Sequence, residues 1–272
     1  MTERFTDRTV IVTGSSDGIG RGIAERFAAE GASVVINSRA YDRAAATATE
    51  IAEAGGTVVA VEADVSDRNA VRRLVDETVE EFGSLDVMVN NAGVTAVEPA
   101  VEMTEEEWRR VIDVNLTGVF FGCQAAAQQM IQQNDGGQII NVSSIFGRVG
   151  VPGRAPYCAS KAAVDNLTRC LAVEFAEHDI HVNALAPGPV RTSMAEDAGT
   201  DANVDAETDA EWPRYSYGPN DVERWTPLSR YGSIQEMGSC ALFLASDDNY
   251  VTGETLVADG GWLAFGWGSK GT

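Results

Sequence analysis

A short β-branched run that leads directly into a glycine-rich turn does most to limit the folds open to this chain. Residues 9–13 (TVIVT) read as a buried strand, and Gly14, Gly18 and Gly20 follow before a helical pattern begins. Glycines in such a turn let the backbone approach an anion, whose charge meets free N–H groups and the positive end of the helix dipole. The segment therefore predicts a strand–turn–helix unit that binds phosphate groups.

Strand and helix patterns alternate along the rest of the chain. Strands are predicted at residues 9–13, 33–37, 57–62, 87–90, 138–143, 181–186 and 255–257. Helices are predicted to begin near Gly18, Arg43, Asp67, Thr104, Pro156 and Ser233, several with capping residues. No internal repeat or linker interrupts this order, which predicts a single α/β domain over residues 1–272 with a doubly wound parallel sheet of about seven strands flanked by helices.

The remaining composition favours a cytoplasmic protein without disulfides or metal. No run of about 18 apolar residues occurs, and residues 1–7 lack the charged-then-apolar pattern of a secretion signal. The only histidines, His178 and His181, have no supporting cluster of Cys or Glu. The cysteines form no CxxC pair and lie within helical patterns, at Cys123, Cys158, Cys170 and Cys240.

The net charge is strongly negative. Forty-one acidic and twenty basic residues give a formal charge of −21, which excludes a general binder of nucleic acid or anionic membranes because phosphates are repelled. A hydrophobic content of 44% with strong periodicity indicates a folded chain rather than a disordered one. Our hypothesis is adaptation to high salt, as in a halophile, where screening removes the self-repulsion.

Tyr157 and Lys161 stand four residues apart at the start of a helical pattern and therefore share a helix face. An ammonium beside the phenol favours the phenolate, which otherwise forms only near pH ~10. Of the twenty basic residues only Lys161 and Lys270 are lysine, and Ser144 lies thirteen residues before Tyr157. A lone YxxxK also occurs on exposed helices, but together these residues predict a proton-transfer site.

Several motifs together resemble the short-chain dehydrogenase/reductase family. They are TGSSDGIG at 13–20, NNAG at 90–93, Asn115, Ser144, YCASK at 157–161, and Pro187-Gly188 followed by Thr192. The resemblance spans essentially the whole chain, in family order and spacing. It implies a Rossmann-like fold and hydride transfer between a nicotinamide cofactor and a small-molecule alcohol or carbonyl.

The resemblance also implies catalytic roles for four residues. Tyr157 is expected to be the general acid in reduction and the base in oxidation, with Ser144 bound to the same substrate oxygen. Lys161 is expected to lower the pKa of Tyr157 and to bind the nicotinamide ribose. Asn115 is expected to hold a water that links Lys161 to solvent, at a kink in its helix.

Matched motif positions also predict the cofactor contacts. Ser38 occupies the position where NAD-preferring relatives carry Asp, and Arg39 follows it, so NADP is favoured, with NAD as the second choice. Asp17, in the glycine turn, opposes that preference. The predicted contacts are Gly14, Ser16, Asp17, Gly18, Ile19, Gly20, Ser38, Arg39, Asp64, Val65, Asn91, Ala92, Gly93, Tyr157, Lys161, Pro187, Gly188, Val190 and Thr192.

Two segments are assigned to substrate binding or assembly. Residues 194–226 are too long for an ordinary loop, and in the family the segment after Pro-Gly covers the substrate, so they are predicted to form a lid. The acidic part, residues 196–211, is alternatively only a solvated insertion. The apolar tail, 261–272, is expected to dock on a neighbouring subunit, at the lid or on its own domain.

The substrate is predicted less sharply than the reaction. Residues 225–230 (WTPLSR) and 260–262 (GGW) look like those of sugar-oxidising members, which favours a sugar or polyol dehydrogenase. The alternative is a 3-oxoacyl-thioester reductase acting on carrier protein or coenzyme A, which the acidic surface should repel except near Arg109 and Arg110. A non-catalytic dinucleotide-binding protein is disfavoured by the intact catalytic set. Apolar residues on more than one face of the helices at 119–133 and 156–175 predict burial between subunits, and the family resemblance implies a homotetramer or homodimer.

Overall fold

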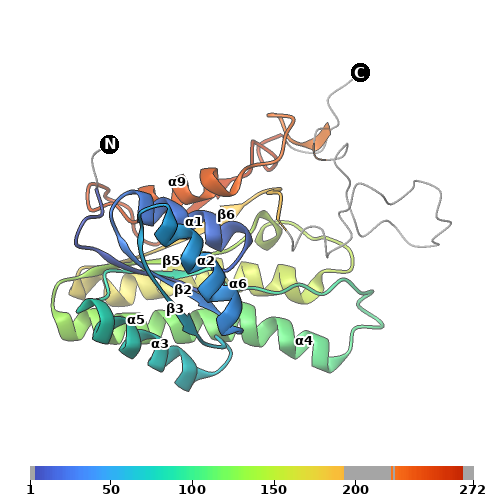
Figure 1. Cartoon of the computed structure of the whole chain (residues 1–272). Coiled ribbons are helices and arrows are strands. Elements are labelled where there is room, and N and C mark those ends of the chain that lie inside the picture. The colour runs from blue at the N-terminus through green and yellow to red at the C-terminus, as the bar shows by residue number, and fades with distance from the viewer. Residues whose placement is uncertain (1–3, 193–221, 223, 266–272) are drawn as a thin grey trace.

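The computed structural model describes residues 4–192, 222 and 224–265, and shows one sheet between two layers of helices (Figure 1). All seven strands are parallel, in the order β3-β2-β1-β4-β5-β6-β7. The strands are β1 (Thr9–Val12), β2 (Ser33–Ser38), β3 (Thr57–Glu62), β4 (Val87–Asn90), β5 (Gly137–Val142), β6 (Ile180–Pro187) and β7 (Thr255–Ala258). The predicted fold class is confirmed, and every predicted strand is present with its ends within one residue.

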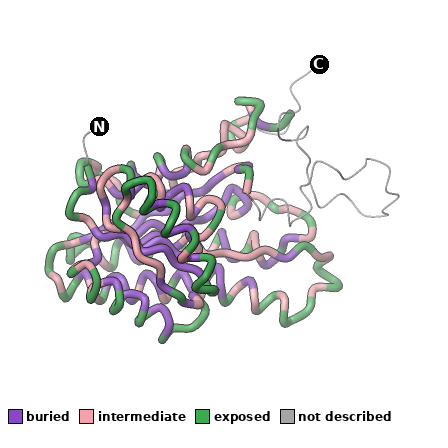
Figure 2. Tube along the Cα trace, in the orientation of Figure 1, coloured by how far each residue is buried: buried purple, intermediate pink, exposed green. Residues whose placement is uncertain are grey.

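Two groups of helices cover the faces of the sheet. One face packs against α1 (Gly18–Ala29), α2 (Tyr41–Glu53) and α9 (Ile234–Leu244). The other packs against α3 (Arg68–Phe82), α5 (Gly118–Gln133) and α6 (Ala155–Phe175), with α4 (Glu105–Ile112) beside α6. The central strands are buried on both faces (Figure 2), as a parallel sheet covered by two helix layers requires.

Capping residues fix where several helices begin. The side chains of Asp17, Asp67 and Thr104 each accept a hydrogen bond from the first turn of α1, α3 and α4. Ser233 and Glu236 form a complete capping box at α9. These ends agree with the predicted helix starts because a cap is a local feature that the sequence carries directly.

A π-helical turn, η1 (Asp113–Thr117), lies between α4 and α5. No pattern in the sequence indicates it, although a kink at Asn115 was expected. Such turns are rare and are frequently found at functional sites. Two short 3₁₀ turns complete the described elements, η2 (Ile145–Gly147) and η3 (Ala176–His178).

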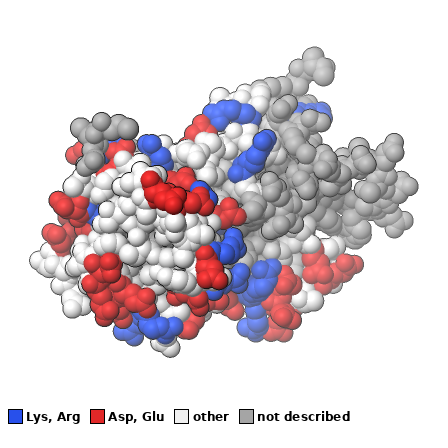
Figure 3. All heavy atoms as spheres, in the orientation of Figure 1, with Lys and Arg blue, Asp and Glu red and all other residues white. Residues whose placement is uncertain are grey.

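The surface carries many acidic groups. On the face drawn in Figure 3, Asp and Glu side chains form several clusters over the described surface, with arginines among them. Several arginines of the described residues are held in ion pairs, such as Arg21 with Glu25 and Glu50. Within the described ranges, no helix combines the length and the apolar character needed to cross a membrane.

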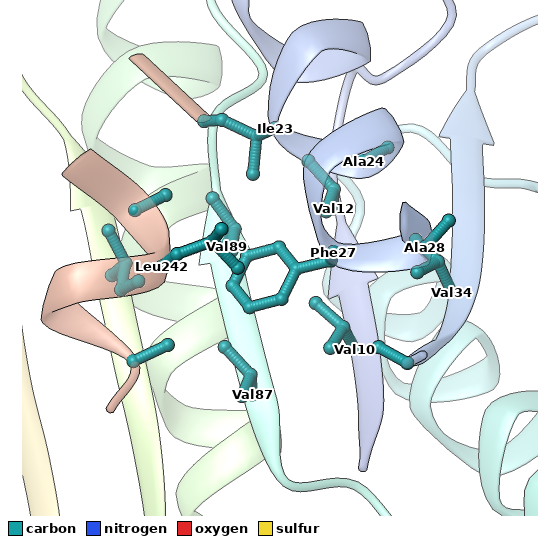
Figure 4. Packing of buried hydrophobic residues seen from close by; sticks show 14 of the residues in the cluster. Val10, Val12, Ile23, Ala24, Phe27, Ala28, Val34, Val87, Val89 and Leu242 are labelled. Carbon is teal, nitrogen blue, oxygen red and sulfur yellow. The ribbon is translucent and has the colours of Figure 1, made fainter. Parts of the chain in front are cut away.

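The core beneath α1 and α9 holds the glycine-rich turn in place. Phe27 of α1 is fully buried among the valines of β1 and β4 and faces Leu242 of α9 (Figure 4). Its ring also meets the ring of Phe5 edge-on, at 5.1 Å between centroids. Because α1 is anchored on the sheet in this way, its N-terminus is fixed at the carboxyl edge of β1.

Two predicted segments lie mainly outside the described residues. Of the proposed lid, 194–226, only residues 222 and 224–226 are described, and of the tail, 261–272, only residues 261–265. Both assignments therefore stay predictions.

Candidate active site

The carboxyl ends of the central strands open into a cleft of about 770 Å³. It brings together most of the residues predicted from the sequence, while Gly20, Asp64 and Asn115 lie outside its lining. The predicted residues that line it are Gly14, Ser16, Asp17, Gly18, Ile19, Ser38, Arg39, Val65, Asn91, Ala92, Gly93, Ser144, Tyr157, Lys161, Pro187, Gly188, Val190 and Thr192.

The glycine-rich turn has the backbone of an anion site. Gly14 and Gly18 have φ angles of +61° and +56°, which side chains rarely tolerate. A Cβ on Gly20 would lie 2.3 Å from Nδ2 of Asn91, so this glycine lets the turn pack against the segment after β4 instead of facing the cleft. Asn91 closes that contact by donating hydrogen bonds to the carbonyl oxygens of Thr13 and Gly14, at 2.9 and 3.1 Å.

These features fit a dinucleotide. Backbone N–H groups of the glycine-rich turn and the start of α1 can meet a pyrophosphate at the cleft wall. Across the turn, Cγ2 of Thr192 lies 3.4 Å from the position of a Cβ on Gly18, so Thr192 borders the same space. The carboxylate of Asp17 also accepts a 2.6 Å hydrogen bond from the N–H of Gly18, which places one negative charge at this end of the helix.

Basic side chains stand at the end of the cleft formed by β2. Ser38 is buried, and its Oγ accepts a hydrogen bond from the N–H of Ala40, whereas Arg39 is exposed. Arg43, in the first turn of α2, also lines the cleft and lies 3.8 Å from the Asp17 carboxylate. Sequence reasoning missed Arg43, although its position four residues after Arg39, in the first turn of the next helix, was a usable signal. The pair fits a cofactor that carries a 2′-phosphate.

Val65 and Asp64 differ in their orientation. Val65 lines the cleft, as predicted. Asp64 instead turns towards the start of α3, where its Oδ1 accepts hydrogen bonds from the N–H and Oγ of Ser66, at 2.9 and 2.7 Å. Its side chain is therefore committed to the turn before α3.

Lys161 is held deep in the cleft. Its Nζ donates a 2.7 Å hydrogen bond to the carbonyl oxygen of Val142 and lies 5.6 Å from the centroid of the Tyr157 ring. The residue is 3% exposed, and burial lowers the pKa of its ammonium to about 8, against the opposing effect of Asp165. A charged lysine at this depth is costly, so its surroundings decide its protonation.

Tyr157 is partly buried beside it. Burial raises the pKa of its phenol, while a hydrogen bond with Ser144 and the positive charge of Arg154 lower it. We expected Lys161 to lower this pKa, but the groups that do so here are Ser144 and Arg154, and burial outweighs both. The phenol is therefore protonated at neutral pH, which suits an acid.

Ser144 is positioned by the turn that follows it. Its Oγ caps η2 by accepting a 3.2 Å hydrogen bond from the N–H of Phe146. The turn presses against α6, because a Cβ on Gly147 would lie 2.8 Å from the backbone carbon of Lys161. This close approach places Ser144 beside Tyr157.

Asn115 is fully buried in η1 and does not line the cleft. Its amide accepts a 2.8 Å hydrogen bond from the N–H of Val94 and donates a 2.9 Å bond to the carbonyl of the same residue. It also donates to Oγ of Ser160, at 3.3 Å. The side chain therefore ties the loop after β4 to η1 and α6 at the catalytic centre.

Pro187, Gly188, Val190 and Thr192 continue β6 along the cleft. The N–H of Gly188 donates to the carbonyl of Ala258, and a Cβ at Gly188 would lie 2.5 Å from Cα of Asp259. Gly188 is thus required by the segment after β7, which it holds close to the cleft.

Phe146 and Arg154 line the substrate end of the cleft and were not indicated by the sequence, whereas Arg110 and Trp262 had been considered there. The rings of Tyr157 and Trp262 lie 6.4 and 6.5 Å from that of Phe146. Arg110 donates a 2.9 Å hydrogen bond to the carbonyl of Thr95, and Arg154 donates to its Oγ1 at 3.1 Å. Arg154 is the N-cap residue of α6, three residues before Tyr157, and this spacing was the one signal for it.

Within residues 4–192, 222 and 224–265, no three side chains of His, Cys, Asp or Glu gather as they would around a metal ion.

Comparisons with known proteins agree with this geometry. A family model described as short chain dehydrogenase matches residues 8–203. The 3beta-hydroxysteroid dehydrogenase 1 of Eggerthella lenta is 42% identical over 267 residues, which cover 97% of each chain. Glucose 1-dehydrogenase 2 of Bacillus subtilis is 39% identical over 97% of this chain and 98% of its own.

A solved structure extends the likeness to three dimensions. The gluconate 5-dehydrogenase from Burkholderia cenocepacia, crystallised with NADP and tartrate, superposes with a TM-score of 0.86 at 33% identity, over 97% of this chain and 98% of its own. Sequence, fold and cleft thus agree, and this chain belongs to the short-chain dehydrogenase/reductase family of oxidoreductases, which bind NAD(P) and act on CH–OH groups.

Proposed function

We propose that this enzyme uses NADP(H) to interconvert a secondary alcohol or hemiacetal and a carbonyl, with a sugar or polyol as substrate. The observation that carries the proposal is the convergence of Ser144, Tyr157 and Lys161 in one cleft, whose other end holds Arg39 and Arg43. The bound nicotinamide dinucleotide supplies or accepts the hydride.

In the proposed mechanism the protein binds the reacting oxygen and moves its proton. Ser144 Oγ and the Tyr157 hydroxyl both bond that oxygen, which places it beside the cofactor. In reduction Tyr157 donates its proton, and the ammonium of Lys161 stabilises the phenolate left behind. In oxidation the same groups act in reverse, with the phenolate as base.

Proton supply is proposed to pass through Lys161. Its Nζ and the Asn115 amide both lie near Gly93, since a Cβ there would be 3.7 Å from Nζ and 3.5 Å from Oδ1 of Asn115. A water held at η1 would complete the path from Lys161 to solvent. The π-turn supports this role because it opens the helix where the water is needed.

The preference for NADP rests on charge at the β2 end of the cleft. Arg39 and Arg43 add two positive charges, and Ser38 supplies no carboxylate to repel a 2′-phosphate. The Burkholderia relative was crystallised with NADP. Asp17 opposes this preference, so NAD is the second choice.

The sugar assignment rests on the mixed character of the substrate end. Phe146 and Trp262 offer aromatic faces for a sugar ring, and Arg154 offers a donor beside Thr95. Glucose and gluconate dehydrogenases among the relatives support this choice.

A hydroxysteroid or similar alicyclic alcohol is the second candidate. Ala96, Val97, Ile145 and Phe146 form an apolar wall in the cleft, and the Eggerthella relative is named a hydroxysteroid dehydrogenase. A 3-oxoacyl thioester is less suited, because Arg109 and Arg110 are already paired with Glu105 and Glu107 and offer little charge to an acidic carrier. The intact Ser144, Tyr157 and Lys161 disfavour a non-catalytic protein.

A substrate screen tests the proposal. NADP⁺ and NAD⁺ reduction would be followed at low and multimolar salt with glucose, gluconate, polyols and a 3β-hydroxysteroid, beside NADPH oxidation with an acetoacetyl thioester. Fastest turnover of a sugar or polyol with NADP⁺ supports the assignment. Turnover of only the steroid or only the thioester would replace the sugar or polyol assignment with that substrate class. Inactivity with all classes would contradict the sugar or polyol assignment.

Assembly into a homotetramer or homodimer is proposed from the outer faces of α5 and α6. Phe120, Ile131 and Val173 are large apolar residues that stay exposed there in the single chain. Sedimentation of the purified enzyme tests this, and a monomer at micromolar concentration would reject it. Deleting residues 265–272 tests the tail separately, because unchanged sedimentation and kinetics would exclude a role in assembly or substrate binding.

Adaptation to high salt is proposed from the net charge of −21, in the cytoplasm of a cell that accumulates salt. The expected result is higher stability and activity in multimolar salt than at 0.1 M. Equal melting temperatures and rates at the two concentrations would reject this part of the proposal.

A further inference from the structure

Asp165 is a buried acid that the proposed mechanism does not use. It lies on α6 one turn beyond Lys161, and its side chain is 8% exposed. Oδ2 lies 3.7 Å from Nε of Arg148, and Oδ1 has no hydrogen-bond partner among the described residues. A carboxylate is expensive to bury without good partners, so its place beside the catalytic lysine calls for a reason.

Arg148 connects this acid to the turn that carries Ser144. It directly follows η2, which Ser144 caps. The turn already packs closely against α6 at Lys161 through Gly147. The ion pair of Arg148 with Asp165 adds a second contact between the same two elements, one helical turn further along α6. The pair therefore spans the two elements whose spacing sets the Ser144–Tyr157 contact.

Asp165 also supplies the negative charge that opposes the burial of Lys161. Burial lowers the pKa of the lysine, and the carboxylate of Asp165 raises it. The other described groups near Nζ are the Tyr157 ring, the Val142 carbonyl of β5, Gly93 after β4 and the Asn115 amide of η1. Arg148 of η2 and Arg154 of α6 are the nearby cations, and the latter acts on Tyr157.

We propose that Asp165, with Arg148, is a positioning residue that holds the Ser144 turn against α6 and places a negative charge one helical turn from Lys161. The ion pair of Arg148 with Asp165 holds the two elements together, and the Asp165 carboxylate supplies a negative charge opposite the Lys161 ammonium. The inference rests on the catalytic roles proposed for Ser144, Tyr157 and Lys161.

The lysine content of the chain allows a direct test without turnover. Only Lys161 and Lys270 occur, so protein labelled with ε-¹³C-lysine gives two signals, and Lys161→Met assigns them. In the Asp165→Asn variant the Lys161 signal should titrate at least about half a pH unit lower than in the wild type. Lys270 is the internal reference. The matched control is Glu30→Gln, which breaks an ion pair of Arg4 at the end of α1.

Variants of Arg148 separate the effect of the ion pair on the position of the Ser144 turn from the effect of the Asp165 charge on Lys161. Arg148→Met should lower kcat at least about fivefold on the best substrate of the screen, while the Lys161 titration stays at or above its wild-type pH because the carboxylate remains. Arg148→Lys should restore most of the rate. In Asp165→Asn, kcat should also fall, and the alkaline limb of the kcat/KM profile should move to lower pH.

Two results would overturn the inference: an Asp165→Asn titration of Lys161 that matches the wild type, or an Arg148→Met rate that matches Glu30→Gln. If Asp165→Asn does not fold, the rates of Arg148→Met and Arg148→Lys decide alone. Tyr157→Phe separates this outcome from failure of the proposed function, because an active Tyr157→Phe enzyme would remove the catalytic roles themselves.

Discussion

The ammonium nitrogen of Lys161 lies 5.6 Å from the centre of the Tyr157 ring, fixed by a 2.7 Å hydrogen bond to the carbonyl of Val142. This bond joins the catalytic helix to the end of β5, so the cation cannot swing away from the phenol. Burial at this point lowers the pKa of Lys161 to about 8 and raises that of Tyr157. The pair thus combines an acid that keeps its proton at neutral pH with a cation that titrates just above it.

Replacing Tyr157 with Phe should lower turnover at least about a hundredfold, because the ring remains but the transferable proton is removed. NADPH binding, measured by fluorescence titration, should change little. Retained turnover in the variant would exclude Tyr157 from proton transfer.

Replacing Lys161 with Met should stabilise the fold at neutral pH while abolishing most activity and weakening cofactor binding. Lowering the lysine pKa from 10.5 to about 8 corresponds to a destabilisation of the folded state by about 3 kcal/mol when Lys161 is charged. Loss of the bond to Val142 offsets about 1 kcal/mol of that gain.

The pH dependence distinguishes this explanation from general packing effects. Between the folded pKa of about 8 and the unfolded value of 10.5, the unfolded chain binds more protons, so wild-type stability contributed by Lys161 rises with pH. The advantage of Lys161→Met should therefore shrink between pH 8 and pH 10.5 in urea unfolding. An advantage that is constant with pH would contradict the cost assigned to the buried charge.

Replacing Ser144 with Ala should move the pH profile of alcohol oxidation. The hydrogen bond from Ser144 lowers the pKa of Tyr157, so its loss raises that pKa and shifts the acid limb of the oxidation profile to higher pH. Turnover should also fall about tenfold or more, because the reacting oxygen loses a partner. A reduced rate with an unmoved limb would assign Ser144 to substrate binding alone.

The sequence predicted the strands and the helix caps well because both depend on local patterns. Periodic valines and isoleucines define β1 whatever surrounds them, and Ser233 with Glu236 caps α9 within one turn. Four-residue spacing likewise placed Tyr157 and Lys161 on one face. That Ser144 joins this pair was predicted from the order of the family motifs, because the sequence itself shows no contact between these residues.

Features that depend on contacts distant in sequence could not be predicted. The π-turn η1 holds Asn115, whose amide bonds the backbone of Val94 twenty-one residues away. Phe146 and Arg154 line the cleft only because η2 and α6 pack together. The hydrogen bond from Ser66 to Asp64 is likewise a feature that the motif position did not indicate, and the contact of Asp64 with the adenine stays a prediction.

Replacing Ser38 with Asp and Arg39 with Leu should shift cofactor preference from NADP towards NAD. The new carboxylate would face the 2′-phosphate, and one of its cations would be lost. The single variant Arg43→Leu should weaken NADP binding. This loss should be smaller than the gain in NAD binding of the double variant, because the Arg43 guanidinium is already paired with the Asp17 carboxylate. The ratio of kcat/KM for the two cofactors measures the shift. A preference of the wild-type enzyme for NAD would show that the role assigned to Arg39 in binding the 2′-phosphate is wrong.

Replacing Trp262 with Ala should raise the substrate KM about tenfold and leave the NADPH dissociation constant unchanged. Its ring meets that of Phe146 edge-on at 6.5 Å, and the Phe146 ring meets that of Tyr157 edge-on at 6.4 Å, so Trp262 is linked through Phe146 to the catalytic tyrosine. Trp262 is held there by a turn in which Asp259 accepts hydrogen bonds from the N–H groups of Gly261 and Leu263. Tyr250→Ala is the control, because that side chain is fully exposed. If both variants keep the wild-type KM, the substrate does not contact Trp262; if Trp262→Ala weakens NADPH binding instead, the ring supports the cofactor.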